Sequence, residues 1–167
     1  MYCYLLFSKP YRAVMKPKIK ENRYKRIIEQ LEPLFAKTTD PLARIATATA
    51  VLHNKFDYFF WTGYYRLING ELTVTSYQGS VACLVLAKDV GVCWAGINQG
   101  KTLIVEDVEK FSGHIACDSR SKSEIVIPGR DKSGEIVGVY DVDSKELASF
   151  DEIDQKYLEK IIAKIYE

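Results

Sequence analysis

The sequence predicts a single α+β domain, built on one central antiparallel sheet of about six strands with helices packed on its faces. Helical apolar periodicity is found near the two ends of the 167-residue chain, whereas hairpin turns and short strand patterns fill the middle. The composition, with 47% hydrophobic and 27% charged residues, is typical of a folded domain. A chain of this length buries roughly 70% of its unfolded surface, so it needs no disulfide or metal to fold.

Two helices are expected before the first strand. Apolar residues at helical spacing predict a helix over residues 19–35, and Pro33 should end or kink it because proline removes a backbone donor. Asp40 is suited to cap a second helix that has Pro41 in its first turn. Residues 1–19 are interpreted as an N-terminal tail, and the domain itself is expected over residues 20–167.

Hairpin signals organise the rest of the chain. Asn69-Gly70 predicts a tight turn between an aromatic strand and its partner, and residues 131–134 predict a second one. A last helix is expected near Ser149, which forms a Ser-x-x-Glu capping box with Glu152. The expected strands cover 58–67, 71–77, 84–86, 102–105, 124–127 and 135–142, and a short helix is expected at 91–96. The first and last helices carry apolar stripes, which pack either on the sheet or on a second copy in a homodimer.

Charge and hydropathy argue against several classes of protein. A net charge of +1 indicates neither nucleic-acid nor membrane binding. No apolar run approaches the roughly 20 residues of a membrane helix, and the apolar N-terminus lacks the basic start of a signal peptide. A cytoplasmic location is therefore expected. In that reducing compartment, cysteines are more often catalytic or metal-binding than structural.

Three cysteines, Cys83, Cys93 and Cys117, are the first candidates for chemistry. Their spacings of 10 and 24 residues do not match the Cys-x-x-Cys motif of zinc or redox sites. A lone free cysteine is usually a small buried apolar residue, but three in glycine-punctuated loops favour a reactive role. His114, three residues before Cys117, either tunes that thiol or satisfies backbone groups.

Acidic and aromatic residues form two further groups. Asp141 and Asp143 are two apart on a predicted strand, so they share one face, and symmetric pairing about 131–134 places Glu124 opposite about Asp141. Clustered carboxylates bind a cation or share a proton; the alternative is a solvated end of the sheet. The aromatic group either packs in the core or forms one wall of a ligand pocket; it comprises Phe59, Phe60, Trp61, Tyr64 and Tyr65.

The loops and strands that carry these residues resemble the GAF-domain free-methionine-(R)-sulfoxide reductases. The resemblance runs from about position 20 to the C-terminus, and Gly-His-Ile-Ala-Cys-Asp together with two upstream cysteines is specific to that family. Its motifs lie at 77–83, 91–93, 105–108, 113–118, 123–126 and 138–144. The resemblance implies an antiparallel sheet with helices on its faces. It also implies an enzyme that reduces free L-methionine (R)-S-oxide to L-methionine with thioredoxin as the reductant and without a cofactor or metal.

The resemblance also implies a role for each candidate residue. Cys117 matches the nucleophile, Cys83 the resolving thiol, and Cys93 a third cysteine that can also form a disulfide. The residues expected to bind substrate are Asp107, Glu124, Asp141, Asp143, Trp61 and Tyr65. Reduction of a sulfoxide needs an acid to protonate its oxygen, and a carboxyl group kept neutral by burial and acidic neighbours could supply it, with Glu124 preferred over Asp143.

Two other functions remain open on the sequence. A GAF sensor would bind a small ligand without chemistry and would need none of the thiols. A zinc-binding domain would use Cys83, Cys93, Cys117 and His114 as ligands. Alkylation of the cysteines and metal analysis, respectively, distinguish these two from the reductase.

Overall fold

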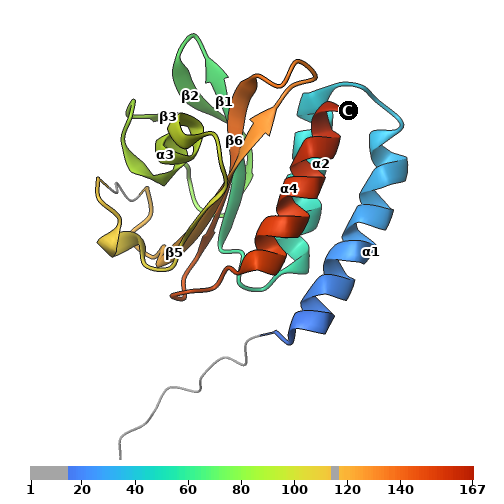
Figure 1. The fold of residues 1–167 in the computed structure, drawn as a ribbon, viewed down its shortest axis with the longest axis horizontal. Coiled ribbons are helices and arrows are strands. Elements are labelled where there is room, and N and C mark those ends of the chain that lie inside the picture. Colours follow the sequence, from blue (N-terminus) through green and yellow to red (C-terminus); the bar gives the residue numbers. More distant parts are fainter. Residues whose placement is uncertain (1–14, 114–116) are drawn as a thin grey trace, which may run out of the picture.

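The chain folds around one antiparallel sheet, which confirms the predicted α+β class. The structure is a computed structural model, and it describes residues 15–113 and 117–167. Within these residues the sheet has six strands in the order β3-β2-β1-β6-β5-β4 (Figure 1). The elements are α1 (Pro17–Phe35), α2 (Pro41–Lys55), β1 (Trp61–Ile68), β2 (Glu71–Gln78), β3 (Val85–Leu86), α3 (Gly91–Gln99), β4 (Leu103–Val105), the 3-10 turn η1 (Val108–Lys110), β5 (Ser123–Arg130), β6 (Ile136–Ser144) and α4 (Glu152–Tyr166).

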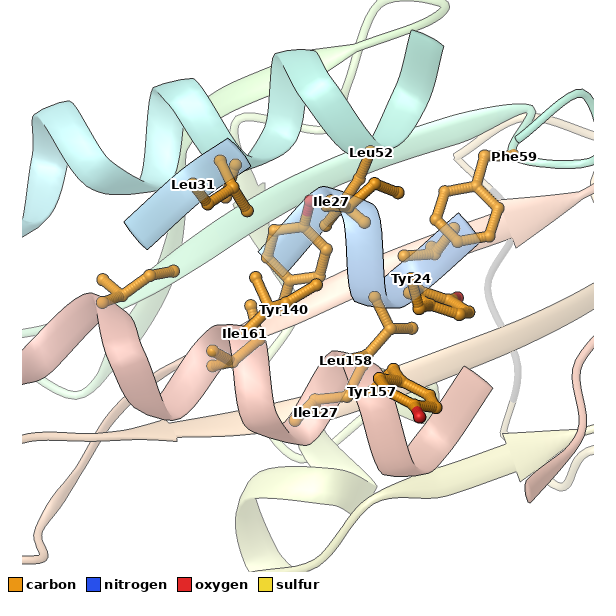
Figure 2. Packing of buried hydrophobic residues seen from close by; sticks show 14 of the residues in the cluster. Tyr24, Ile27, Leu31, Leu52, Phe59, Ile127, Tyr140, Tyr157, Leu158 and Ile161 are labelled. Atoms are coloured by element: carbon orange, nitrogen blue, oxygen red, sulfur yellow. The ribbon is translucent and has the colours of Figure 1, made fainter. Parts of the chain in front are cut away.

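The two faces of the sheet are covered differently. Helices α1, α2 and α4 lie together on one face, whereas α3 lies on the other (Figure 1). The main core forms under the three helices, where side chains from α1, α2 and α4 meet those of the central strands (Figure 2). A second cluster, which includes Trp61, Cys93 and Val126, forms beneath α3. The sheet therefore has one face for stability and another that is available to build a site.

The apolar stripes of the terminal helices are covered within the monomer. Tyr24, Ile27 and Leu31 of α1 and Leu158 and Ile161 of α4 are all at most 2% exposed (Figure 2). Of the two alternatives for these stripes, packing on the protein's own sheet is the one observed. A homodimer would have to use another surface.

A buried polar network ties α1 to the start of α4. The Lys20 ammonium group contacts Asp154 at 2.6 Å, and the hydroxyls of Tyr24 and Tyr58 donate to the same carboxylate at 2.7 and 2.5 Å. Asp154 is completely buried, and burial of a charge is tolerated when it is paired and hydrogen-bonded in this way. The network orients α1 on the helical face of the sheet.

Several predicted boundaries shift in the structure. Helix α1 begins at Pro17, so the end of the expected 1–19 tail is helical, while residues 1–14 lie outside the described residues. Pro33 does not end the helix, which continues to Phe35. A proline in the last turn removes only its own donor, so it costs less there than in a helix centre. The short helix predicted at 91–96 runs on to Gln99.

The capping box of the last helix was predicted two residues too early, at Ser149 instead of Asp151. The cap is Asp151, whose carboxylate accepts hydrogen bonds from the backbone N–H groups of Ile153 and Asp154, and the Asp154 carboxylate accepts one from the backbone N–H of Asp151. The Ser149 hydroxyl instead donates to Ser144 and to a carbonyl in the preceding loop. Both segments match the capping pattern, and the loop contacts decide which one is used.

The β5–β6 hairpin pairs two residues away from the symmetric register. Glu124 lies opposite Asp143, and Asp141 lies opposite Val126, because two one-residue shifts add up. The turn closes with a hydrogen bond from Asp131 to Glu135, one residue beyond the symmetric turn, and a bulge between Gly129 and Arg130 adds the second residue. The prediction that Glu124 faces Asp141 was therefore wrong. A shift of two residues leaves every side chain on its original face, so the three acids still point the same way.

None of the helices that the structure describes is long and apolar enough to cross a bilayer.

Candidate active site

Strand alternation brings three carboxylates to the α3 face of the sheet. Glu124 on β5 and Asp141 and Asp143 on β6 alternate with Ile125 and Val142, which enter the main core. Glu124 is 6% exposed and Asp141 is 7% exposed. The alternative of a solvated sheet end does not hold for these acids.

The aromatic residues divide between the two faces in the same way. Trp61 and Tyr65 lie on the α3 face of β1, whereas Phe59 and Tyr64 pack in the main core. The fifth residue, Phe60, is partly buried and contacts the cations of Arg120 and Lys145. Core packing thus explains part of this group, and Trp61 with Tyr65 forms the aromatic wall of a site.

The Trp61 indole is held in a defined orientation. It stacks with the rings of Tyr65 and Tyr77, at centroid distances of 5.9 and 5.7 Å, and its Nε1 donates to the Ser80 carbonyl at 3.1 Å. Gly63, two residues further along the same face, makes this possible, because a Cβ there would overlap the indole ring. The wall is therefore set by its neighbours before any ligand arrives.

A cavity of about 240 Å³ lies between the acids, the aromatic wall and the start of α3. This is smaller than the pockets that take drug-sized ligands, which suits a molecule the size of an amino acid. Among the described residues, its lining contains no lysine, arginine or histidine. The side chains that matter chemically in the lining are Trp61, Tyr65, Cys83, Cys93, Cys117, Asp118, Ser121, Glu124, Asp141 and Asp143.

All three candidate cysteines line this cavity, in two different states. Cys83, in the β2–β3 connection, forms a disulfide with Cys117, in the loop before β5, and their Cα atoms are 5.8 Å apart. Cys117 is exposed, so the disulfide can be reached from solvent. Cys93 is a free thiol in the first turn of α3; it is buried, with its Sγ 4.0 Å from Glu124 Oε1.

Burial and mutual repulsion disfavour charge on the acids. Burial raises the pKa of Glu124 and of Asp141 well above the usual carboxyl range. Charge on Asp141 and Asp143 raises the pKa of Glu124 further, and charge on Asp143 raises that of Asp141. Burial also raises the pKa of Asp143, to about 7. The same causes raise the pKa of the Cys93 thiol. The cluster therefore retains at least one proton near neutral pH unless a cation enters.

The cluster also offers unused acceptor capacity. Asp141 Oδ1 is buried, and no hydrogen-bond partner for it lies among the described residues. Such an atom carries a desolvation cost that a bound cationic group would remove. The donor atoms of Cys93, Glu124 and Asp141 lie within 4.8 Å of one another, close enough to surround a small cation.

The zinc site considered from the sequence is not assembled here. Two of its four ligands, Cys83 and Cys117, are joined as a disulfide and so offer no thiolate. A third, His114, lies outside the described residues.

The structure places Asp107 at the start of η1, and its role in substrate binding stays a prediction. Asp107 is absent from the described cavity lining; its carboxylate pairs with Lys110 at 3.0 Å and accepts a bond from the Glu109 backbone. Lys110 holds the pKa of Asp107 below its usual range. Its visible role is to cap η1, in the segment that leads to the Cys117 loop.

Sequence reasoning missed two residues that line the cavity, Asp118 and Ser121. Asp118 forms a two-pronged ion pair with Arg120, at 2.6 to 3.2 Å, which lowers the pKa of its carboxyl. Its position directly after Cys117 was a signal that could have identified it. Ser121 carries no comparable signal, because it reaches the cavity only through the turn that follows Asp118.

Known proteins with similar sequences and folds share most of this chain's length, although no protein-family model matches it. GAF domain-containing protein A of Dictyostelium discoideum is 49% identical over 144 residues, covering 86% of this chain and 90% of the relative. The free methionine-R-sulfoxide reductase of Escherichia coli is 34% identical over 142 residues, covering 85% and 86%. The structure of the Neisseria meningitidis free methionine-R-sulfoxide reductase in complex with its substrate has a TM-score of 0.83 and 38% identity, covering 88% of both chains. The chain therefore has the fold of a GAF domain and belongs to the free methionine-R-sulfoxide reductase family.

Proposed function

We propose that this protein reduces free L-methionine (R)-S-oxide to L-methionine and is recycled by thioredoxin. One observation carries the proposal: a solvent-accessible disulfide opens on the same small cavity as a buried acidic cluster and an aromatic wall. The disulfide is the product expected of a thiol-dependent reductase after one turnover. A sensor domain that only binds a ligand would need neither sulfur at its cavity.

Cys117 acts as the nucleophile of the reduced enzyme. Its thiolate attacks the sulfoxide sulfur while an acid protonates the sulfoxide oxygen, and collapse moves that oxygen to the cysteine. Methionine leaves, and Cys117 becomes a sulfenic acid. The Cys83 thiol then attacks this sulfur, forming the observed disulfide and releasing water. Two electrons and two protons from thioredoxin restore both thiols.

The acidic cluster has two tasks in this scheme. One substrate ammonium group cannot neutralise three buried carboxylates, so one of them remains protonated and is available as the acid. We assign this role to Glu124, which is buried between the two aspartates and the Cys93 thiol. Asp141 and Asp143 then bind the ammonium group, for which the unpartnered Asp141 Oδ1 is an acceptor.

The same arrangement explains a preference for the free amino acid. Within a peptide the methionine nitrogen carries no charge, so it would leave the aspartates uncompensated, and a cavity of about 240 Å³ has little room for flanking residues in addition to the methionine sulfoxide side chain. Trp61 and Tyr65 would contact the methyl group and separate the two sulfoxide configurations. Contact with one methyl group is worth about 1–3 kcal/mol, which is enough for useful discrimination.

Cys93 is a weaker candidate for the resolving thiol. It is buried among carboxylates, and its raised pKa keeps it as a thiol rather than a thiolate. Cys83, in contrast, is already joined to Cys117 in the disulfide. We therefore assign Cys93 to the floor of the site, with a disulfide of its own as an alternative during turnover. Recycling by thioredoxin also implies a reducing compartment, which we propose is the cytoplasm.

The deciding experiment measures methionine release from three substrates, with dithiothreitol and with thioredoxin as reductants. Free methionine (R)-sulfoxide should be reduced, whereas the (S)-sulfoxide and N-acetyl-methionine (R)-sulfoxide, which lacks the ammonium group, should not. Failure to reduce the free (R)-sulfoxide with either reductant would overturn the proposal. Ligand binding that survives alkylation of all the cysteines, with no turnover, would point to a sensor instead.

A further inference from the structure

An apolar rim lies beside the disulfide, on its Cys83 side. It consists of Val81, Leu84 and Val85, which are 83%, 72% and 48% exposed. All three lie within two residues of Cys83, at the end of the β2–β3 connection and the start of β3, and Val81 and Val85 line the same cavity as Cys83 and Cys117. The rim and the disulfide thus belong to one surface. Contiguous exposed apolar side chains of this kind mark interaction sites more often than chance placement.

The rim is held outward by the edge of the sheet. The Leu84 carbonyl accepts a hydrogen bond from Val74 at 3.0 Å, and Val85 pairs with Thr73 in the β2–β3 ladder. Turning the side chains of Leu84 and Val85 inward would break the ladder bonds that hold the short edge strand. The exposure of these two residues is therefore a property of the folded chain.

We propose that this rim is the docking surface for the protein dithiol that reduces the Cys83–Cys117 disulfide. The inference rests on the proposed function only for the identity of the reductant. Any protein that reduces this disulfide must place a thiolate on the axis of the S–S bond, whatever substrate the enzyme acts on. The partner thiolate attacks one sulfur, a mixed disulfide forms, and the other sulfur leaves as a thiolate that takes up a proton. The second partner thiol then breaks the mixed disulfide, which leaves the partner oxidised and both cysteines reduced.

The disulfide itself indicates what covers the rim. Because one end of it is joined to Cys83, a protein that contacts the sulfur must also lie over the residues on either side of Cys83. The partner chemistry that fits is a surface thiol surrounded by apolar groups, since the rim offers no charge to pair with. A small dithiol such as dithiothreitol reaches the bond without covering the rim, and this difference makes the proposal testable.

The test compares two reductants on the disulfide form of Leu84 variants. Leu84 is absent from the described cavity lining, so its replacement leaves the proposed catalytic groups in place. Leu84→Ser removes the apolar contact, Leu84→Glu adds a buried charge in the complex, and Leu42→Glu is the matched control. Leu42 is 40% exposed and lies on α2, on the opposite face of the sheet.

We expect Leu84→Ser to slow reduction by thioredoxin about 5- to 10-fold and Leu84→Glu to slow it more than about 10-fold, as for other central interface residues. Reduction by dithiothreitol should change less than about twofold, and Leu42→Glu should behave as the wild type with both reductants. The reaction is followed as free thiol release without any sulfoxide. Its outcome is therefore independent of whether methionine sulfoxide is the substrate.

Four results would overturn the proposal. An equal decrease of the reduction rate with both reductants would mean that Leu84 supports the disulfide itself. An unchanged reduction rate with thioredoxin would mean that the partner docks elsewhere. A raised Michaelis constant for sulfoxide with dithiothreitol would make the rim part of the substrate site. Dissociation of a wild-type dimer by Leu84→Glu, with the thioredoxin rate unchanged, would identify a second copy as the occupant.

Discussion

The acidic cluster should make the ligand-free protein less stable as the pH rises, and Asp143→Asn should relieve this loss. The pKa of Asp143 in the folded protein is about 7, against an ordinary value of 3.8, mainly because the carboxyl is buried. The folded state therefore binds more protons than the unfolded state between these two values. By linkage, its stability falls as the pH rises through that window and levels off above it.

The size of the effect follows from the same shift. Three pH units at about 1.4 kcal/mol each set an upper bound of about 4 kcal/mol. Asp143 is partly exposed and shares protons with Glu124 and Asp141, so part of this penalty is screened. We therefore expect the stability of Asp143→Asn relative to the wild type to increase by about 2 kcal/mol between pH 4.5 and pH 8.

Urea denaturation of the disulfide form at these two pH values measures the change. Asp107→Asn is the control, because Lys110 lowers the pKa of Asp107 and its carboxyl is ionised throughout the range, so its effect on stability should not vary with pH. A difference between Asp143→Asn and the wild type that stays constant or shrinks with pH would refute the reasoning. Free methionine should stabilise the wild type at pH 8, because its ammonium group replaces the missing protons.

Four further predictions concern catalysis. Cys117→Ser should abolish methionine formation even in a single stoichiometric turnover, and release at a wild-type rate would exclude it as the nucleophile. Cys83→Ser should keep the first turnover but slow thioredoxin-driven cycling; unchanged cycling, together with a mapped disulfide from Cys117 to another cysteine, would assign resolution elsewhere. Glu124→Gln should lower the single-turnover rate at saturating substrate by about 10²–10⁴-fold, and a loss of only a few-fold would mean that another group donates the proton. Gly63→Ala should displace the indole of Trp61, which a change in tryptophan fluorescence would report, and should weaken discrimination between the (R)- and (S)-sulfoxides. An unchanged ratio of the two reduction rates would show that this wall does not distinguish the configurations.

Local patterns in the sequence determined which elements form and which side chains share a face. The Asn69-Gly70 turn, with both residues at positive φ, was predictable because few residues tolerate that backbone conformation. The common face of Asp141 and Asp143 was predictable because strand periodicity is two. Both properties depend on neighbours within a few residues, which is the range over which sequence reasoning works.

The tertiary structure alone decided how these pieces meet. A longer turn at Asp131–Glu135 and the bulge at Gly129 together moved the partner of Glu124 from Asp141 to Asp143, and the turn sequence does not specify such a bulge. Burial of the acids depends on α3 and the cysteine loops covering the sheet, and this packing produces the raised pKa values. Asp107 is absent from the described cavity lining, whereas Asp118, which sequence reasoning did not identify, is part of it. Distances across the fold depend on the whole chain path, so side chains far apart in sequence become one site only when the packing is complete.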